Sequence, residues 1–351
     1  MGALEFDEDS LANITYSRSI ANSGMYGVAT SQLTADCYLS DLTSQMLATM
    51  IQPNTPVIFS AGGFGFTFPA FILGYADVSS KGVLRITAYD LCTNADVKFS
   101  PGEQFTEKDS SGNKNTYSAI EILNAAAAQI GFNAASYSAK IEFPKLYYSE
   151  FAGKSCRQIF EEFSKFGGVW YADGEYINFL PYCSPVNSFT ADKDSRTELI
   201  FMGSREISHA YITDGTYSQT YEYGSGEWYK TQAVSGQYLI GKNSCDAAAG
   251  AIVGKIYKAW KCDSMIIDSM IKPDMAFNGE YIPLDITINF GCTAICASAG
   301  APAVQQSYTD YEDEKQRAIS NKLSKNTIYK NVFVNENDGF TYTYFEEDET
   351  E

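Results

Sequence analysis

The chain has 351 residues and a mass of 38.6 kDa, which is long enough for two or three domains. Its 25 basic and 43 acidic residues give a formal net charge of −18, and this balance argues against a protein whose main task is to grip phosphate backbones. Because 45% of the residues are hydrophobic and only 19% are charged, the composition excludes a disordered acidic chain, and the 14% of aromatic residues favours β structure.

Residues 1–98 predict a small antiparallel β sandwich or barrel. Between Leu33 and Leu39, apolar and polar residues alternate, which is the period-two pattern of a strand with one buried face. A short helix or loop is expected over 41–51, and a glycine-rich turn over 61–65 separates later strands. These later strands are expected over 57–60, 66–75 and 83–90.

Residues 99–182 predict a compact α/β unit. Capping boxes at 118–121 and 155–158 mark the starts of two helices, and the first helix ends at Gly131. An Asp173-Gly174 turn between two aromatic strands predicts a hairpin over 169–179. The second helix has one apolar stripe, made by Cys156, Ile159, Phe160 and Phe163.

From residue 183 onward strands dominate again, with helices expected over 245–260 and 311–326. Small and polar residues over 297–310 predict an exposed loop, and a last hairpin is expected around 337–339. The strands expected in this part are 198–202, 206–213, 216–223, 227–232, 265–271 and 281–290.

The predicted fold class is therefore α+β and mainly β, with an α/β domain between two antiparallel β-barrel or sandwich domains. Whether the two β-rich parts are copies of one fold stays open, because no sequence repeat links them. The predicted domains are 1–98, 99–182 and 183–345, followed by an acidic tail at 346–351.

No catalytic, metal or cofactor site is predicted, so we expect a protein that is not an enzyme. The single histidine, His209, excludes a zinc site with two histidines and lies in a strand-like run without a nucleophile motif. The glycines of 62–65 lie between strands and not before a helix, which argues against a phosphate loop. Glu161 and Glu162 are neighbours on a helix and point to different sides, which favours a solvated edge over a glycosidase pair.

The cysteines are expected to be reduced thiols. No CxxC pair occurs, and the closest two, four residues apart, would lie about 13 Å apart on a strand, too far for a disulfide. The first residues lack a basic head and a long apolar core, so we expect no signal peptide, assembly in a cytoplasm and no stable membrane insertion. The eight are Cys37, Cys92, Cys156, Cys183, Cys245, Cys262, Cys292 and Cys296.

Two groups of aromatic residues have alternative interpretations. The first alternates across the predicted hairpin, which favours packing on the neighbouring helix over stacking on a sugar. The second, between Tyr211 and Tyr229, includes Trp228, and its side chains either pack on their own sheet or line a binding surface or subunit interface. The hairpin group comprises Trp170, Tyr171, Tyr176 and Phe179.

Several motifs follow one another in a recognisable order. The first β-rich part contains Leu33-Thr-Ala-Asp-Cys-Tyr-Leu39, a proline-bounded segment at 53–57, and Gly74-Tyr75 followed by Ile86-Thr-Ala-Tyr-Asp90. The α/β unit contains the helical segments 119–127 and 155–168 and the hairpin end 177–181. Over residues 25–182 this order resembles the baseplate hub or tail-tip hub family of phage tails and related contractile injection systems. The rest of the chain is similar in architecture only.

The resemblance implies a homotrimer in which each subunit gives two tube-like β-barrels to a ring, so that six similar units meet a sixfold tail tube. It implies a virion structural protein of the tail baseplate or tip, assembled in the host cytoplasm. Its expected partners are the tail tube protein, a central spike or tip protein and other baseplate proteins, with DNA passing through the ring without specific binding. The alternatives are a carbohydrate-binding or adhesin module and a tail-associated peptidoglycan hydrolase.

The acidity is concentrated in the β-rich parts. Residues 1–98, 99–182 and 183–351 carry net charges of −5, −3 and −10, from 4, 7 and 14 basic and 9, 10 and 24 acidic residues. One interpretation is that these charges only keep the protein soluble. The other is that much of the acidity faces a central channel and repels the phosphates of a passing genome, over the roughly 8–10 Å that salt screening allows.

Overall fold

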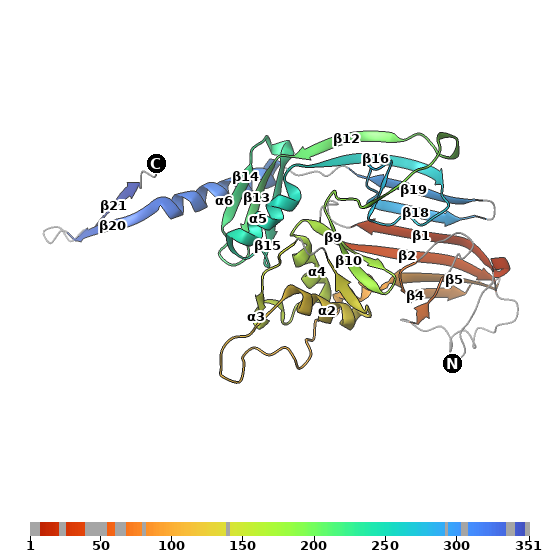
Figure 1. Ribbon diagram of the computed structural model, residues 1–351, viewed down its shortest axis with the longest axis horizontal. Coiled ribbons are helices and arrows are strands. Elements are labelled where there is room, and N and C mark those ends of the chain that lie inside the picture. The colour runs from red at the N-terminus through yellow and green to blue at the C-terminus, as the bar shows by residue number, and fades with distance from the viewer. Residues whose placement is uncertain are drawn as a thin grey trace.

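One long antiparallel sheet joins the two β-rich parts of the chain (Figure 1). The computed structural model describes residues 8–20, 26–38, 55–59, 68–78, 82–137, 141–291, 294–302, 308–334 and 341–347. Every neighbouring pair along this sheet is antiparallel. In sheet order the strands are β12 (Ile200–Ile207), β16 (Lys255–Ile266), β19 (Ile295–Ala301), β18 (Asp285–Phe290), β1 (Leu11–Ile20), β2 (Gly27–Tyr38), β5 (Val83–Asp90), β4 (Phe71–Val78) and β3 (Pro56–Val57).

The two β-rich parts meet where β1 pairs with β18. Their register runs from Ile14 opposite Phe290 to Ser19 opposite Asp285, so residues more than 260 positions apart in the chain are neighbours. The observed architecture is mainly β, with antiparallel sheets and few helices, which confirms the predicted fold class. The domain boundaries at 98, 182 and 345 stay a prediction.

One face of the long sheet is covered by other parts of the chain. Tyr16, Leu33, Ala88 and Ile288 lie on four neighbouring strands, share this face and are at most 3% exposed. The ring of Phe68 lies 5.7 Å from that of Tyr16, and it also contacts Phe59 and Phe290 at 4.8 and 5.8 Å. Burial of these apolar groups, worth about 25 cal/mol per Å² of area, holds the connecting segments on this face.

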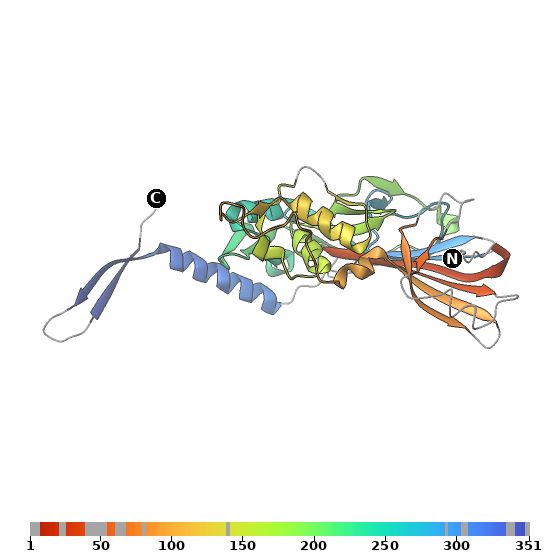
Figure 2. The ribbon, with the colours of Figure 1, turned by 90° about the horizontal axis from the view of Figure 1, so that it is seen from below.

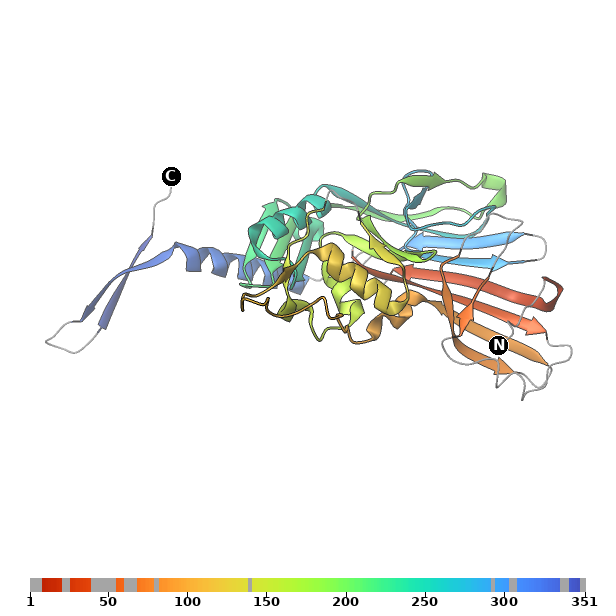
Figure 3. The same ribbon diagram turned by 60° about the horizontal axis from the view of Figure 1, so that its bottom comes forward.

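The middle unit packs beside one end of the long sheet, where β9 pairs with the beginning of β2 (Figure 3). Its first helix has the predicted cap, because Ser118 donates to Glu121 from both its backbone N and its Oγ, at 2.8 and 2.6 Å. Gly131 ends that helix at φ 104°. The elements are β6 (Thr116–Tyr117), α2 (Ala119–Ile130), β7 (Ala134–Ser136), β8 (Leu146–Tyr147), α3 (Tyr148–Phe151), α4 (Cys156–Ser164), β9 (Gly168–Asp173) and β10 (Tyr176–Pro181).

The predicted hairpin packs on the predicted amphipathic helix. Strands β9 and β10 pair around Asp173-Gly174, with Gly174 at φ +60°. Trp170 on β9 is fully buried, and its ring centroid lies 5.2 Å from that of Phe160, which belongs to the buried stripe of α4. This contact confirms the packing interpretation of the aromatic hairpin.

A smaller sheet, ordered β14-β13-β15, carries helix α5 and the beginning of helix α6. Glu314 of α6 is buried and accepts hydrogen bonds from Thr213 and Arg317, both at 2.9 Å. Beyond this contact, α6 and the hairpin β20–β21 extend away from the body (Figure 2). The remaining elements are β11 (Asn187–Phe189), β13 (His209–Asp214), β14 (Thr220–Gly224), β15 (Thr231–Gly236), α5 (Gly241–Ile252), β17 (Met275–Phe277), α6 (Tyr308–Asn326), β20 (Thr327–Val334) and β21 (Thr341–Glu347).

The helix predicted over 245–260 is wrong in its second half. Helix α5 ends at Ile252, and Gly254, at φ +83°, turns the chain into strand β16. Trp260 and Cys262 of this strand are buried on the covered side of the sheet. Pairing within the long sheet therefore determines the structure here, although the spacing of the apolar residues is typical of a helix.

The exposed loop predicted over 297–310 is wrong for its first residues, which form β19. Ile295, Ala297, Ala299 and Ala301 alternate along this strand and are all buried between β16 and β18. The small side chains permit a close approach, because a Cβ atom at Gly300 would lie 2.9 Å from the carbonyl oxygen of Trp260. The small and polar composition of this segment favours a loop, whereas the alternation of its residues with a period of two correctly indicates a strand.

In the first β-rich part the strand over 83–90 is confirmed, and the alternation from Leu33 continues a longer strand, β2. The strand predicted over 57–60 corresponds to β3, which comprises only Pro56–Val57. The strand predicted over 66–75 corresponds to β4, which begins at Phe71. The segments predicted over 41–51 and 61–65 lie outside the described residues.

Replacement of Phe160 by alanine should lower the free energy of unfolding by about 3–5 kcal/mol, because it leaves a cavity beside Trp170. Replacement of Tyr176, which is 49% exposed on the same hairpin unit, should change it by less than about 1 kcal/mol. Equilibrium denaturation monitored by circular dichroism measures both, and equal losses would contradict the assigned packing.

Candidate functional site

The second face of the long sheet is polar and uncovered, and we call it the open face. It is formed by the residues of β18, β1, β2 and β5 that alternate with the covered ones. Val28, Tyr38 and Val83 have the same orientation at the strand ends, and Val28 is buried. Among the polar residues of this face, all but three are uncharged, and all except Asp36 are half-buried or exposed. They are Asp285, Thr287, Asn289, Thr15, Ser17, Ser19, Thr30, Gln32, Thr34, Asp36, Arg85, Thr87 and Tyr89.

The charged groups of the open face form hydrogen bonds with neighbours on the same face. Asp36 accepts from Arg85 Nε at 2.7 Å and from Asn13 Nδ2 at 2.8 Å, and these hydrogen bonds lower the pKa of Asp36. Asp285 accepts from Ser19 Oγ at 2.5 Å. The face therefore presents hydroxyl and amide groups, without the row of basic side chains that binds phosphates.

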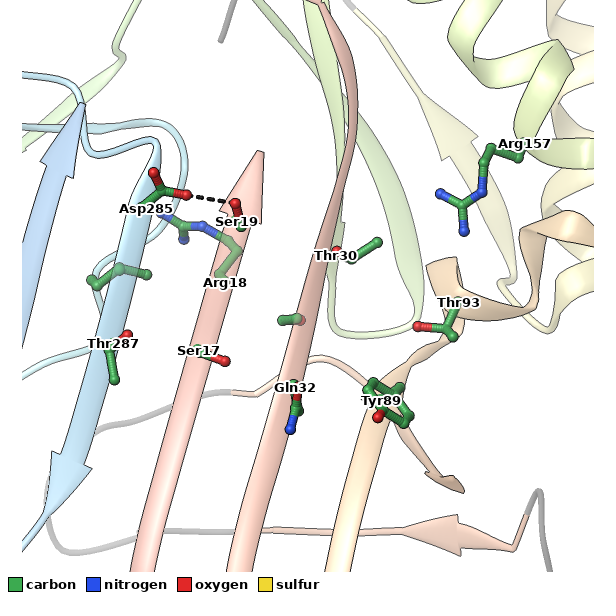
Figure 4. Close-up of a pocket in the computed structure, with 12 residues that line it drawn as sticks. Ser17, Arg18, Ser19, Thr30, Gln32, Tyr89, Thr93, Arg157, Asp285 and Thr287 are labelled. Carbon is green, nitrogen blue, oxygen red and sulfur yellow. Dashed lines mark hydrogen bonds between the residues drawn. The ribbon is translucent and has the colours of Figure 1, made fainter. Parts of the chain in front are cut away.

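A hollow of about 410 Å³ lies on the open face beside α4 (Figure 4). Ser17, Gln32 and Thr287 line it from three adjacent strands, which places hydroxyl and amide groups side by side. Arg157 enters from α4, and its guanidinium donates to Asp96 Oδ1 at 2.7 Å and to the carbonyl oxygen of Cys92 at 3.1 Å. This arginine is held by its own helix junction, and most of the other side chains that line the hollow carry hydroxyl or amide groups.

A second hollow of about 370 Å³ continues the open face across β18, β19 and β16. It shares Asp285 and Thr287 with the first hollow, and Ser298 adds another hydroxyl. Lys261 and Asp263 form an ion pair at 2.6 Å at its far side. The same chemistry, neutral polar groups with paired charges, thus extends over both β-rich parts.

Asp90 anchors the sheet from its covered side. Its carboxylate accepts from the backbone N and Oγ of Ser31, at 2.7 and 2.5 Å, and from the backbone N of Cys92 at 3.1 Å. Burial is the largest effect on this group and raises its pKa to about 6, against the lowering effect of these hydrogen bonds. Asp90 therefore fixes β2 against β5 and against the turn that leads to the middle unit.

The residues considered above for catalysis are His209, Glu161, Glu162 and the glycines of 62–65. His209 is buried, with Nδ1 2.9 Å from Thr231 Oγ1 and Nε2 3.1 Å from Glu222 Oε1. Glu162 pairs with Lys165 at 2.7 Å and accepts from the backbone N of Gln237. Glu161 has a raised pKa because it is partly buried. The glycine-rich segment 62–65 lies outside the described residues.

The aromatic run over 211–229 divides into a buried part and an exposed part. Tyr211 is buried and packs on His209, with ring centroids 4.6 Å apart. Trp228, Tyr229 and Tyr217 are 41%, 49% and 77% exposed. The packing interpretation is therefore correct for Tyr211, whereas a binding surface or subunit interface at Trp228 and its neighbour stays a prediction.

The seven cysteines that the structure describes are free thiols, and Cys292 lies outside the described residues. Burial raises the pKa of Cys37, Cys156 and Cys183 to about 11 and that of Cys245 to about 12. Thiols with such pKa values carry almost no nucleophilic thiolate near neutral pH, which matches inert core residues.

Within the ranges described, three or more histidine, cysteine or acidic side chains never come together in an arrangement suited to a metal ion.

Across those same ranges, each helix is either too short or too polar to span a bilayer.

Comparison with known proteins identifies relatives by structure alone. Neither a protein-family model nor a curated protein matches the sequence. The prophage tail protein gp18 from Listeria monocytogenes EGD-e is 12% identical, with a TM-score of 0.49 over 90% of this chain and 94% of that chain. The 43 kDa tail protein of prophage MuSo2 from Shewanella oneidensis is 10% identical, with a TM-score of 0.48 over 82% of this chain and 92% of that one.

A third similar structure is the Escherichia coli c3393 protein, described as a type VI secretion component with similarity to the bacteriophage T4 tail proteins gp27 and gp5. It is 9% identical, with a TM-score of 0.42 over 85% of this chain and 74% of that chain. The three similar structures are thus described as tail or type VI secretion proteins.

The raised pKa of Asp90 predicts a pH-dependent stability. Between the ordinary pKa near 3.8 and the folded value of about 6, the folded state binds more protons than the unfolded state, so this group lowers stability as pH rises through that window. Asp90→Asn should lose this component, so the difference in unfolding free energy between wild type and variant should shrink from pH 4 to pH 7. Urea denaturation at both pH values measures it, and a difference that grows with pH would contradict the assignment.

Iodoacetamide at pH 8 should label the native protein slowly and the urea-unfolded protein rapidly, because burial suppresses thiolate formation. Mass mapping without a reductant should also find no disulfide among the seven described cysteines. Rapid native labelling of Cys37 or Cys245 would show that these thiols are not buried as described.

Proposed function

We propose that this chain is a structural, non-enzymatic hub of a phage or phage-like tail, in which three copies form a ring around a central axis. The observation that carries the proposal is the order of strands in the long sheet. The proposal also draws on the motifs over residues 25–182, whose order resembles the tail hub family.

The two β-rich parts contribute strands in the same arrangement. In the first part, strands that follow the chain order β1, β2, β4, β5 take the sheet order β1-β2-β5-β4. In the second part, β12, β16, β18 and β19 take the order β12-β16-β19-β18. In both sets the fourth strand in chain order lies between the second and the third in the sheet. The long sheet therefore contains the same four-strand arrangement twice, with the last strand of one set, β18, beside the first strand of the other, β1.

Two sets per chain suit an adaptor between threefold and sixfold symmetry. Three chains present six similar four-strand sets, which match the six subunits of a tail tube ring, while the chain itself repeats three times around the axis. In this proposal the sets in 1–98 and 183–345 are tube-like domains, and the unit over 99–182 lies outside the ring wall.

The open face lines the bore in this arrangement. The covered face carries the aromatic cluster around Phe68, so a sheet that closes with this face inward would fill its own channel. The open face of β18, β1, β2 and β5 has two aspartates and one arginine, and Asp36 is paired with Arg85. An acidic channel wall was one interpretation of the net charge. We propose instead that the wall is nearly neutral and presents hydroxyl and amide groups.

Such a wall suits the passage of DNA without retention, because it offers neither the basic side chains nor the stacked aromatic platform that hold nucleic acids. The proposed partners are the tail tube protein on one end of the ring, a central spike or tip protein on the other, and further baseplate proteins. The proposed location is the baseplate or tip of the virion, after assembly in the host cytoplasm.

Native mass spectrometry of the purified protein tests the proposal. We expect a species of three times the 38.6 kDa chain mass, which binds tail tube protein and lacks cell-wall hydrolysis in a zymogram. A ring of six chains, or a monomer that stays monomeric in the presence of tube protein, would contradict it. Binding of the monomer to glycans would instead support the adhesin alternative, through exposed residues such as Trp228.

A further inference from the structure

We propose that an aromatic patch at the base of helix α6 docks a basic segment of another protein, with an arginine side chain stacked on its rings. The patch consists of Trp228 and Tyr229 of the short helix η5 (Trp228–Lys230) and of Tyr308, the first residue of α6. None of these residues belongs to the long sheet. The inference therefore goes beyond the proposed ring and is tested independently of it.

The three rings of the patch are exposed and yet contact one another. Trp228, Tyr229 and Tyr308 are 41%, 49% and 56% exposed. The ring centroid of Trp228 lies 6.2 Å from that of Tyr229 and 5.9 Å from that of Tyr308, and both pairs are nearly perpendicular. Exposed apolar residues are usually scattered singly on a soluble protein, whereas tryptophan and tyrosine gather where a partner binds. The cluster therefore has the composition of a contact surface.

Neighbouring groups hold these rings in fixed orientations. The hydroxyl of Tyr229 donates to the carboxylate of Glu227, and the hydroxyl of Tyr308 donates to that of Glu312; each hydrogen bond raises the pKa of its tyrosine. The ring of Tyr311, one turn further along α6, lies 6.0 Å from that of Tyr308 and supports it from the side of the small sheet. A surface that is already ordered loses little side-chain entropy when a partner binds.

The charges around the rings favour a cation. Residues 227–230 and 308–315 contain five acidic and two basic residues. Both lysines already have acidic neighbours, because Lys230 pairs with Glu206 at 3.3 Å and Lys315 with Glu312 at 3.8 Å. An aromatic face attracts a cation through its quadrupole, and a nearby carboxylate adds a direct charge interaction. The patch therefore offers both groups that recognise a basic side chain.

This chemistry selects a basic protein segment over other ligands. A second copy of this chain carries a net charge of −18 and nucleic acid carries phosphates, so the same carboxylates disfavour both. A glycan would stack on the rings as well but would make no use of the excess negative charge. Arginine fits best, because its planar guanidinium stacks on a ring and at the same time donates two hydrogen bonds to a carboxylate.

Peptide binding to the purified full chain tests this chemistry. The probe is a fluorescein-labelled peptide of repeated Arg-Gly-Ser units, and peptides of the same length carry Lys or Glu in place of Arg. In fluorescence anisotropy we expect the Arg peptide to bind, the Lys peptide to bind about threefold more weakly, and the Glu peptide not to bind. Equal binding of the Arg and Lys peptides would reduce the interaction to charge alone and overturn the stacking, as would no binding of the Arg peptide.

Variants place the binding on the patch. Trp228→Ala should weaken binding of the Arg peptide about fivefold and Glu227→Gln about twofold, since each removes one of the two interactions. The matched controls on the middle unit are Tyr176→Ala, at a residue that is 49% exposed, and Glu107→Gln, at an exposed carboxylate; neither should change the affinity. All four side chains are accessible, so the circular dichroism spectrum should stay unchanged. Equal losses in patch and control variants would show binding through net charge and overturn the proposal.

Photo-cross-linking in the assembled particle identifies the partner. Irradiation of a Tyr229→p-benzoylphenylalanine variant, followed by mass spectrometry of the peptides, should join this position to an arginine-containing segment of another protein of the particle. A cross-link to a second copy of this chain, to a segment without a basic residue or to a glycan would overturn the docking proposal, as would the absence of any cross-link. None of these outcomes bears on the number of chains in the ring, which native mass spectrometry measures.

Discussion

The antiparallel pairing of β1 with β18 is the constraint on which the rest of this structure depends. It turns two separate stretches of strands into one sheet and fixes which side of both stretches is covered. Because side chains alternate along strands, a shift of this register by one residue would put Tyr16 and Ile288 on opposite faces of the sheet.

The contrast between the two faces links the packing of the chain to its proposed role. On the covered face, aromatic rings, buried aliphatic side chains and the carboxyl group of Asp90 hold the connecting segments in place. On the open face, hydroxyl and amide groups and hydrogen-bonded carboxylates give a polar surface. The excess of acidic residues in the sequence is therefore a poor guide to the charge of this particular surface, because net charge carries no information on which face a residue takes.

Local signals in the sequence predicted local structure well. The capping box at Ser118 and the Asp173-Gly174 turn depend on neighbouring residues, so both could be located before the structure. The pairing of β1 with β18 could not, because alternation shows that a strand has a buried face and does not show which distant strand it meets. The small residues of β19 favour a loop in the sequence, because their burial depends on close approach to β16, which only the fold shows. The exposed apolar start of β12 was missed for the same reason, as an apolar run looks buried until its neighbours are known.

The central claim is that three chains close into one ring with the open face inward, and a cryo-electron microscopy map of the assembled particle tests it most directly. The account predicts three copies around the axis, with the strands of both β-rich parts in one continuous barrel and Ser17, Gln32 and Thr287 facing the bore. A map in which these residues face outward, or in which the number of copies around the axis is not three, would contradict it.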